Sequence, residues 1–327
     1  MSESIHDFDT LELYDKKNIN WFIVNWCLGN TCNFECSYCP DYLHNGTKKW
    51  HTVDNIKAVV NKIKKYHPEK KIYFEFTGGE VSLYKEFIPI CQVCMDNDVK
   101  VGFITNGSRT LRWWEENKHY FDHVMMSFHS EFADPEHFCK VVEILHFENR
   151  THCNIMMNPD PDLFDMCVGV ANRIRGMGNV SIALQPLIHD LAGELYDYTP
   201  DQQYVIDNQF DLITKRIKWT KTFDNYRGNM RAIRADGSEH PKSVAPHLFI
   251  NKNTNNWFGW DCHVGVEQMV VDMDGSVYRG WCKVGNSIGN INDVNLVLPT
   301  KSIVCDKTLC HCNFDIMSTK KRLPGGV

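Results

Sequence analysis

Residues 32–40 of the chain read Cys-Asn-Phe-Glu-Cys-Ser-Tyr-Cys-Pro, which places three cysteines on one short stretch. Three residues separate the first cysteine from the second, and two separate the second from the third. Three thiolates on one loop can bind three irons of a [4Fe–4S] cluster and leave the fourth iron without a protein ligand. Because an iron with an open position can bind a further molecule, the stretch indicates a site for chemistry rather than a simple electron store.

A structural zinc site and disulfides are the alternative uses of these cysteines. Zinc takes four ligands and usually binds two separated pairs of cysteines, whereas this loop supplies three thiols in one place. Disulfides are disfavoured because the spacings are too tight to bridge all three residues. We therefore favour the iron–sulfur interpretation.

A second motif follows at residues 71–80, which read Lys-Ile-Tyr-Phe-Glu-Phe-Thr-Gly-Gly-Glu. The apolar and aromatic run predicts a strand. The two glycines predict a sharp turn where the backbone approaches a ligand closely. Taken alone, the motif is equally typical of an ordinary turn, so its value depends on its position after the cysteine loop.

Together, the two motifs resemble those of radical S-adenosylmethionine (radical SAM) enzymes. The loop resembles the CxxxCxxC signature of that family, including the aromatic residue Tyr38, and residues 78–80 resemble its GGE motif. The resemblance implies that Cys32, Cys36 and Cys39 bind a [4Fe–4S] cluster whose open iron is chelated by SAM. It also implies that Gly78, Gly79 and Glu80 contact the methionine amino group of SAM. In such enzymes an electron from the cluster cleaves SAM to a 5′-deoxyadenosyl radical, which abstracts a hydrogen atom from the substrate.

Composition predicts a cytoplasmic protein without membrane association. The 327 residues are 43% hydrophobic, but no stretch approaches the ~20 apolar residues that a membrane-spanning helix needs. Residues 1–9 are polar and acidic and do not resemble a signal peptide. The fourteen cysteines are therefore expected to be metal ligands or free thiols. The net charge of −6 argues against general nucleic-acid binding.

Strands alternate with helices along the first 190 residues. We expect strands at 21–28, 72–76, 99–105, 123–128, 153–157 and 180–184, and helices at 52–66, 84–95, 109–120, 135–147 and 161–175. This alternation predicts an α/β fold with a parallel sheet. Six units are too few for a closed eight-stranded barrel. The count agrees with the partial (β/α)6, TIM-like barrel that the radical SAM resemblance implies for residues 20–190.

The predicted organisation has four parts. Residues 1–20 form an N-terminal extension, residues 21–190 the barrel, residues 191–260 a bridging region and residues 261–327 a small C-terminal extension. In the bridging region we expect a helix that begins near Thr199-Pro200-Asp201 and covers residues 204–219. Residues 221–247 are rich in positive charge. They are either a solvated connector or a site for an anionic substrate group.

Polar residues follow several predicted strands, where parallel α/β proteins bind ligands. The family resemblance implies that Asn106, Ser127 and Gln185 contact SAM. His129 and Glu131 are candidates for the substrate side. Each of these residues is alternatively a polar side chain that caps a turn.

The C-terminal extension contains five cysteines: Cys262, Cys282, Cys305, Cys310 and Cys312. Residues 268–278 predict a β-hairpin around an Asp-Gly turn. A hairpin bracketed by cysteines resembles the SPASM or shorter twitch extension of radical SAM enzymes, which binds an auxiliary [4Fe–4S] cluster. We favour one such second cluster. Its preferred ligands are Cys262, Cys282, Cys310 and Cys312, with Cys305 as a substitute, and a structural zinc is the alternative.

Three functions remain at this point. The first is dehydrogenation or epimerisation of a small polar metabolite, and the second is maturation of a ribosomally made peptide by crosslink, thioether or epimer formation. About twenty residues precede the first strand. This leaves no room for a peptide-recognition domain there and favours the first function. The third is a non-catalytic metal protein. The two enzyme functions need an external electron donor such as flavodoxin or ferredoxin.

Overall fold

The computed structural model describes residues 8–146, 150–189, 194–209, 228–240, 244–251 and 253–323. Its main sheet has nine strands in the order β12-β11-β10-β2-β3-β4-β5-β6-β7. Strands β2 to β7 are parallel neighbours in chain order. They comprise β2 (Trp21–Cys27), β3 (Lys71–Thr77), β4 (Val99–Thr105), β5 (His123–His129), β6 (Arg150–Met157) and β7 (Val180–Pro186).

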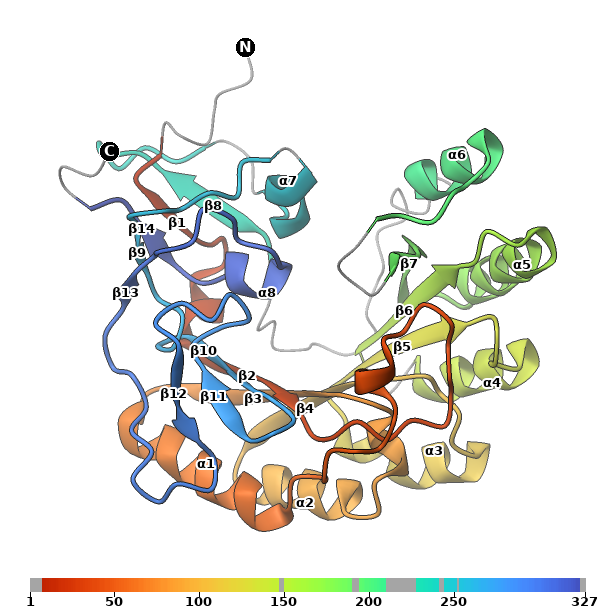
Figure 1. Cartoon of the computed structure of the whole chain (residues 1–327), viewed down its shortest axis with the longest axis horizontal. Helices are drawn as coiled ribbons and strands as arrows, with labels where there is room; N and C mark the ends of the chain where they lie inside the picture. The colour runs from red at the N-terminus through yellow and green to blue at the C-terminus, as the bar shows by residue number, and fades with distance from the viewer. Residues whose placement is uncertain are drawn as a thin grey trace.

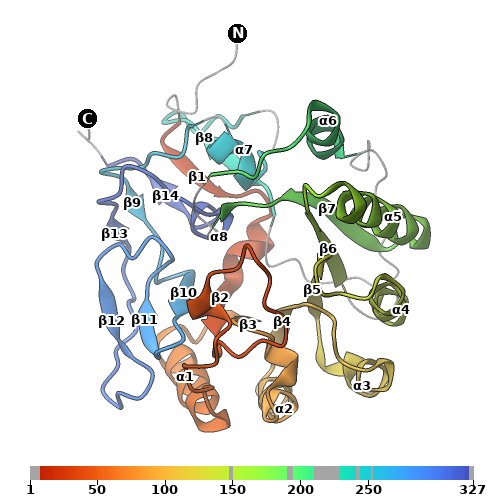
Figure 2. The same ribbon diagram turned by 45° about the vertical axis from the view of Figure 1, so that its right-hand side comes forward.

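Five helices follow these strands and cover the outer face of the curved sheet, as Figures 1 and 2 show. They are α1 (Val53–Tyr66), α2 (Phe87–Asp96), α3 (Leu111–Asn117), α4 (Pro135–Leu145) and α5 (Pro161–Met177). Short 3-10 helices lie at η2 (Lys16–Asn20), η3 (Asp41–Leu43), η4 (Val81–Leu83) and η5 (Lys118–Tyr120). The predicted α/β fold, with a partial TIM-like parallel sheet, is confirmed.

Local sequence explains where the helices begin. The Thr52 side chain accepts a hydrogen bond from the Asn55 amide and caps α1. Asp134 caps α4 in the same way and is followed by Pro135, whose fixed backbone angle suits the first helical position. The predicted first residues of two helices, α2 and α3, were too early in the sequence. Residues 81–83 form a 3-10 turn, so α2 begins at Phe87, and Thr110 caps α3.

The core lies between the sheet and the helices. Along β6 the buried residues alternate with partly exposed ones, so that Cys153 and Ile155 pack in the helix-facing core. The intervening side chains, including His152 and Asn154, belong to the opposite face of the strand. On β2 and β3 that opposite face carries the hydrogen-bonded pair Asn25 and Glu75 beside apolar side chains such as Tyr73.

The predicted hairpin is present, and its first strand extends the main sheet. β10 (Gln268–Val271) pairs antiparallel with β11 (Ser276–Tyr278), which pairs with β12 (Ser287–Asn290). β10 also lies parallel beside β2. The hairpin thus continues the sheet past its first barrel strand.

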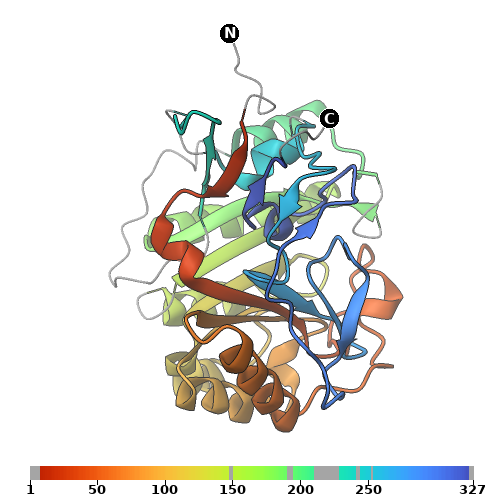
Figure 3. The ribbon, with the colours of Figure 1, turned by 90° about the vertical axis from the view of Figure 1, so that its left-hand side faces the viewer.

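A second sheet combines strands from three parts of the chain that the sequence predicted to be separate. Its order is β13-β9-β14-β1-β8. The strands are β13 (Ile303–Val304), β9 (Asp261–Cys262), β14 (Lys320–Lys321), β1 (Thr10–Leu13) and β8 (Met230–Ile233). Figure 3 shows this sheet beside the end of the main sheet that β10, β11 and β12 form. The N-terminal, bridging and C-terminal segments therefore share backbone hydrogen bonds.

The remaining helices are short. They are α6 (Pro200–Asn208), α7 (Pro246–Asn251) and α8 (Asn313–Ile316). The helix predicted to begin near Thr199-Pro200-Asp201 does begin at Pro200, with Thr199 as its cap, and Gln209 follows it in a left-handed conformation. Residues 210–227, including the remainder of that prediction and Arg227 of the basic stretch, lie outside the described residues. Within the described ranges, no helix is both long and apolar enough to cross a lipid bilayer.

Candidate active site

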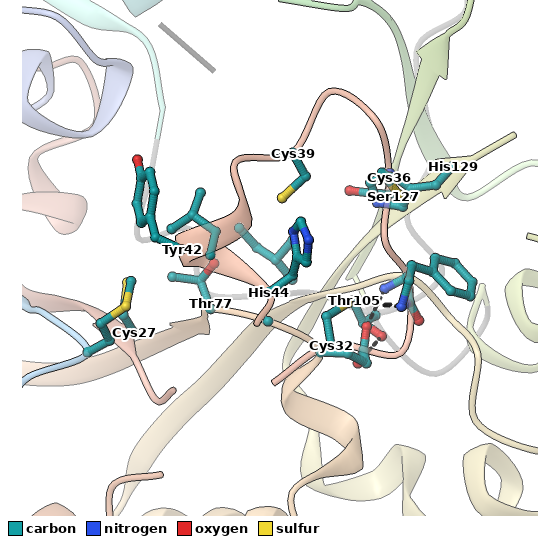
Figure 4. Close-up of a pocket in the computed structure, with 18 of the residues that line it drawn as sticks. Cys27, Cys32, Cys36, Cys39, Tyr42, His44, Thr77, Thr105, Ser127 and His129 are labelled. Atoms are coloured by element: carbon teal, nitrogen blue, oxygen red, sulfur yellow. Dashed lines mark hydrogen bonds between the residues drawn. The ribbon is translucent and has the colours of Figure 1, made fainter. Parts of the chain in front are cut away.

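A cavity of about 530 Å³ opens at the carboxyl ends of strands β2 to β5. Its lining includes the three loop cysteines and the Gly78-Gly79-Glu80 turn. Asn106 and Ser127 line it from the ends of β4 and β5. Figure 4 shows the loop arching over the cavity with Cys32, Cys36 and Cys39 at different points along its rim. The fold thus brings most of the predicted site residues to one place.

Residues at and after β5 hold the cysteine loop in position. The Tyr38 hydroxyl lies 2.5 Å from Nδ1 of His129, and the two rings stack at a centroid distance of 5.9 Å. The Ser37 amide and hydroxyl both donate to the Glu131 carboxylate, at 2.8 and 2.5 Å. Both contacts fall between the second and third cysteines. These hydrogen bonds therefore hold the loop against the sheet between Cys36 and Cys39.

Burial sets the protonation of the Tyr38–His129 pair. It lowers the pKa of the His129 imidazole to about 4 and raises that of the Tyr38 phenol well above its usual range. Both groups are therefore neutral at pH 7. The Tyr38 hydroxyl can donate to Nδ1 of His129 or accept from it, depending on the imidazole tautomer. His129 also lines the cavity.

The glycine turn fits against the chain that enters the cysteine loop. Gly78 and Gly79 have φ angles of +96° and +45°. A Cβ atom on Gly78 would lie 2.4 Å from the Gly29 oxygen, and one on Gly79 would lie 2.3 Å from the Thr31 oxygen. The Glu80 amide also donates to the Thr31 oxygen at 2.9 Å. Only glycine permits this close backbone contact.

The Glu80 carboxylate joins the ends of β3 and β4. It accepts hydrogen bonds from the Thr105 hydroxyl at 2.8 Å, the Asn106 amide at 2.6 Å and the Ser82 amide at 3.1 Å. Burial raises the pKa of Glu80, and these hydrogen bonds act in the opposite direction. The Asn106 side chain then reaches the loop, where it donates to Asn33 at 3.0 Å. Glu80 and Asn106 thus link the glycine turn to the cysteine loop.

The loop thiols fit an iron–sulfur cluster by their chemistry. Burial raises the pKa of Cys36 to about 12, that of Cys39 to about 11, and also that of Cys32. Thiols of this kind deprotonate when they bind a metal ion. In the described part of the chain, no three His, Cys, Asp or Glu side chains converge into a compact metal-ligand group. The match therefore rests on three thiols that share one loop and one cavity.

Three residues predicted for the site do not line the cavity, and several residues that line it were not predicted. Tyr38 is buried, Glu131 accepts hydrogen bonds from Ser37, and Gln185 lies on β7. Asn25, Met273 and Trp281 line the cavity but were not predicted. Strand alternation places Asn25 on the inner face of β2. Only the β2–β10 pairing, which is remote in sequence, brings Met273 and Trp281 there.

The C-terminal cysteines lie close together in the second sheet and its connections. Cys262, Cys282 and Cys305 belong to one small buried cluster. The Cys310 thiol interacts electrostatically with Cys262 and with Cys312. The Cys312 sulfur accepts a hydrogen bond from the Asp315 amide at the start of α8. Thiols have the chemistry to bind a metal ion, but in the described residues these five do not form a compact metal-ligand group.

Comparisons with known proteins agree with the geometry. Residues 26–154 match the family described as the Radical SAM superfamily. A curated relative, the S-adenosylmethionine-dependent nucleotide dehydratase of Fibrobacter sp. (strain UWH6), is 26% identical over 96 residues. That match covers 28% of this chain and 29% of the relative, so the aligned part spans less than a third of the relative's length.

Two solved structures share the fold. The structure of native anSMEcpe with bound AdoMet superposes with a TM-score of 0.50 at 18% identity, covering 83% of this chain and 78% of that chain. Streptococcus suis SuiB bound to the precursor peptide SuiA superposes with a TM-score of 0.52 at 12% identity, covering 86% of this chain and 65% of SuiB.

The match over residues 26–154 includes both the cysteine loop and the glycine turn, and it supports the radical SAM resemblance that these two motifs predicted. It covers less than half of the chain.

Proposed function

We propose that this chain is a radical SAM enzyme that cleaves SAM reductively and removes a hydrogen atom from a small polar substrate, which it dehydrogenates or epimerises. The observation that best supports this proposal is that one cavity is lined by all three loop cysteines and by the glycine turn. When bound there by Cys32, Cys36 and Cys39, the cluster supplies the electron that cleaves SAM. The chain's own residues hold the loop, orient the ligand and restrict water.

The cavity residues have distinct tasks in this proposal. The backbone of Gly78 and Gly79 provides a surface against which SAM lies closely, and Ser127 and Asn106 supply hydrogen-bonding groups at neighbouring strand ends. Glu80 supports the site through its three hydrogen bonds to β4 and η4. Asn25 and Trp281 form a wall on the β2 side, where the Trp281 indole N–H donates to the side-chain oxygen Oδ1 of Asn25 at 3.1 Å. That wall is our candidate substrate surface.

The proposal includes a second [4Fe–4S] cluster at the C-terminal cysteines. Cys262, Cys282 and Cys305 pack together, and Cys310 interacts with Cys262. We therefore favour these four as ligands. Compared with the set preferred from the sequence, Cys305 takes the place of Cys312, whose sulfur caps α8. An electron removed from the substrate in a dehydrogenation needs an acceptor, and a second cluster is suited to accept it.

Maturation of a peptide is the second candidate function. It is supported by the likeness in fold to SuiB, whose structure contains a precursor peptide. The likeness over 96 residues to a protein named as a nucleotide dehydratase supports a small polar substrate instead. A panel of nucleotides, aminosugars and short peptides, each tested for stimulation of SAM cleavage, separates the two.

Iron analysis combined with SAM cleavage tests the main proposal. The anaerobically prepared wild type should contain about eight irons, and a Cys32/Cys36/Cys39→Ala variant about four, because each cube holds four irons. With dithionite, the wild type alone should release 5′-deoxyadenosine. A fully loaded wild type that releases none would overturn the proposed reaction. About four irons in the wild type and none in the variant would remove the second cluster.

A further inference from the structure

Lys320 is a buried charged residue beside the C-terminal cysteines. Its side chain is 1% exposed, which is unusual for lysine. It lies on β14, directly opposite Cys262 of the neighbouring strand β9. Burying an ammonium group is costly unless partners compensate it. The groups that surround the Lys320 ammonium therefore indicate the role of its charge.

Hydrogen bonding fixes the charge of this group. Nζ of Lys320 donates to the carbonyl oxygens of Asp315, Ile316 and Ser318 at 2.7, 3.0 and 2.9 Å. Three acceptors require three N–H donors, and only the charged ammonium form has three. The group also lies 4.9 Å from the centroid of the Trp257 ring, where an aromatic face attracts a cation.

The charged and sulfur-containing neighbours of Lys320 are those of the C-terminal site. Its electrostatic neighbours are Cys262, Cys310, Asp315 and Glu267. The Asp315 carboxylate is itself held by the Gln268 side chain at 2.9 Å and by the Cys282 amide at 2.7 Å. A fixed positive charge thus lies among the proposed cluster ligands.

We propose that Lys320 sets the reduction potential of the C-terminal cluster. This inference rests on the proposed function. A cube bound by four thiolates carries net negative charge, and reduction adds one more. A buried cation beside it stabilises the reduced form more than the oxidised form, because the interior screens charge weakly. Lys320 therefore raises the potential and makes the cluster a better electron acceptor. Lys320 acts through the cluster and is not a catalytic residue.

The alternative role is structural, since the three carbonyls lie at and just beyond the end of α8. A potential measurement distinguishes the two roles. The full-length Cys32/Cys36/Cys39→Ala variant serves as parent, because it would hold only the C-terminal cluster. Lys320→Met removes the charge and the donors, Lys320→Gln removes the charge but keeps an amide donor, and Lys320→Arg keeps the charge. Each is titrated anaerobically by EPR after iron analysis.

A matched control comes from Lys62 on α1. Its Nζ also donates to main-chain carbonyls of the C-terminal part of the chain, those of Val294 and Leu296, at 2.8 and 3.0 Å. We expect Lys320→Met and Lys320→Gln to keep about four irons. Their electron affinity should fall at least tenfold, which is about 59 mV for a one-electron couple. Lys320→Arg and Lys62→Met should stay within threefold of the parent.

The remaining outcomes also decide the matter. Neutral Lys320 variants that hold all their iron at an unchanged potential would overturn the inference and leave the proposed function intact. A parent without iron would overturn the inference and remove the second cluster from the proposed function, but it would leave the proposed SAM cleavage at the cysteine loop intact. If Lys320→Met and Lys320→Gln lose iron, the melting temperatures of the iron-free proteins distinguish the charge role from the structural role. Iron-free variants that melt like the parent, with iron retained only in Lys320→Arg, support the charge role. Variants that fail to fold show that Lys320 is a structural cap.

Discussion

At the scale of single residues, the cysteine loop depends on side chains that carry no sulfur. Glu131 and His129 hold Ser37 and Tyr38, the two residues between the second and third cysteines. The loop would otherwise have few regular backbone contacts, since a single turn joins the Cys39 amide to the Cys36 oxygen at 2.9 Å. The spacing of the cysteines fixes which metal cluster is favoured. The contacts from β5 and the turn after it fix where the loop lies relative to the sheet.

Glu131→Gln should loosen the loop. Glutamine keeps one carbonyl acceptor but loses the charge and the second oxygen, so one of the two hydrogen bonds from Ser37 is lost. A hydrogen bond of this kind contributes about 1 kcal/mol, and hydrogen exchange of the 32–40 segment should accelerate about fivefold. Glu136→Gln makes the same change in a surface ion pair with Arg173 and should leave the segment unaffected. Unchanged exchange in Glu131→Gln would show that the loop holds itself.

His129 should make the protein acid-sensitive. Its pKa is about 4 in the folded state and 6.5 in the unfolded chain, so the unfolded chain binds the extra proton between these values. The stabilisation is complete above about pH 6.5 and is lost as the pH falls towards 4. The shift corresponds to about 3 kcal/mol.

Urea unfolding of wild type and His129→Gln across this pH range measures the effect. The variant should lose less stability on acidification than the wild type. His146→Gln, at the end of α4 near the surface, serves as the control and should behave like the wild type. If His129→Gln and the wild type lost equal stability on acidification, titration of other groups would be responsible for the loss.

At the scale of elements, the turn between β3 and η4 determines how the loop meets the sheet. Gly79→Ala would place a Cβ atom 2.3 Å from the Thr31 oxygen in a left-handed backbone conformation. Strain of this kind typically costs about 1–3 kcal/mol, and we expect a loss near 2 kcal/mol together with weaker SAM binding in calorimetry. The clash is with main-chain atoms, so no side chain can rotate away to relieve it.

Gly169→Ala is the matched control for that substitution. A Cβ atom at this position in α5 meets nothing within 4 Å. Alanine should stabilise the helix by about 0.5–1 kcal/mol and leave SAM binding unchanged. If both substitutions were tolerated equally, the close contact between the turn and residue 31 would not be important for the site.

Sequence patterns predicted the elements of the barrel well because their signals are local. Thr52 and Asp134 mark helix starts, and the order of strands and helices implies parallel pairing. The pairing of β10 with β2 joins residues that are some 240 positions apart, and nothing in either strand specifies its neighbour. The wall formed by Asn25 and Trp281 was missed for the same reason, since it exists only after that pairing.

At the scale of the whole molecule, the N-terminal strand connects the parts of the second sheet. β1 lies between β14 and β8, and Leu11 pairs with Lys320 on one side and with Ala232 on the other. The Leu11 side chain packs in the same core as Cys310 and Ile316. Strand β1 thus packs directly against the C-terminal cysteine region, although about three hundred residues separate Leu11 from Cys310 in the sequence.

Leu11→Ala should therefore affect the two proposed clusters unequally. Truncating a buried leucine typically costs about 2–5 kcal/mol, and Leu11 is 2% exposed. Because its core contains Cys310 and not the loop cysteines, mild urea should release iron from the C-terminal site first, while SAM cleavage by the remaining cluster persists. Tyr14→Ala, just beyond β1 and 55% exposed, should release iron like the wild type. Simultaneous loss of iron and SAM cleavage in Leu11→Ala would instead show that the second sheet and the barrel unfold as one unit.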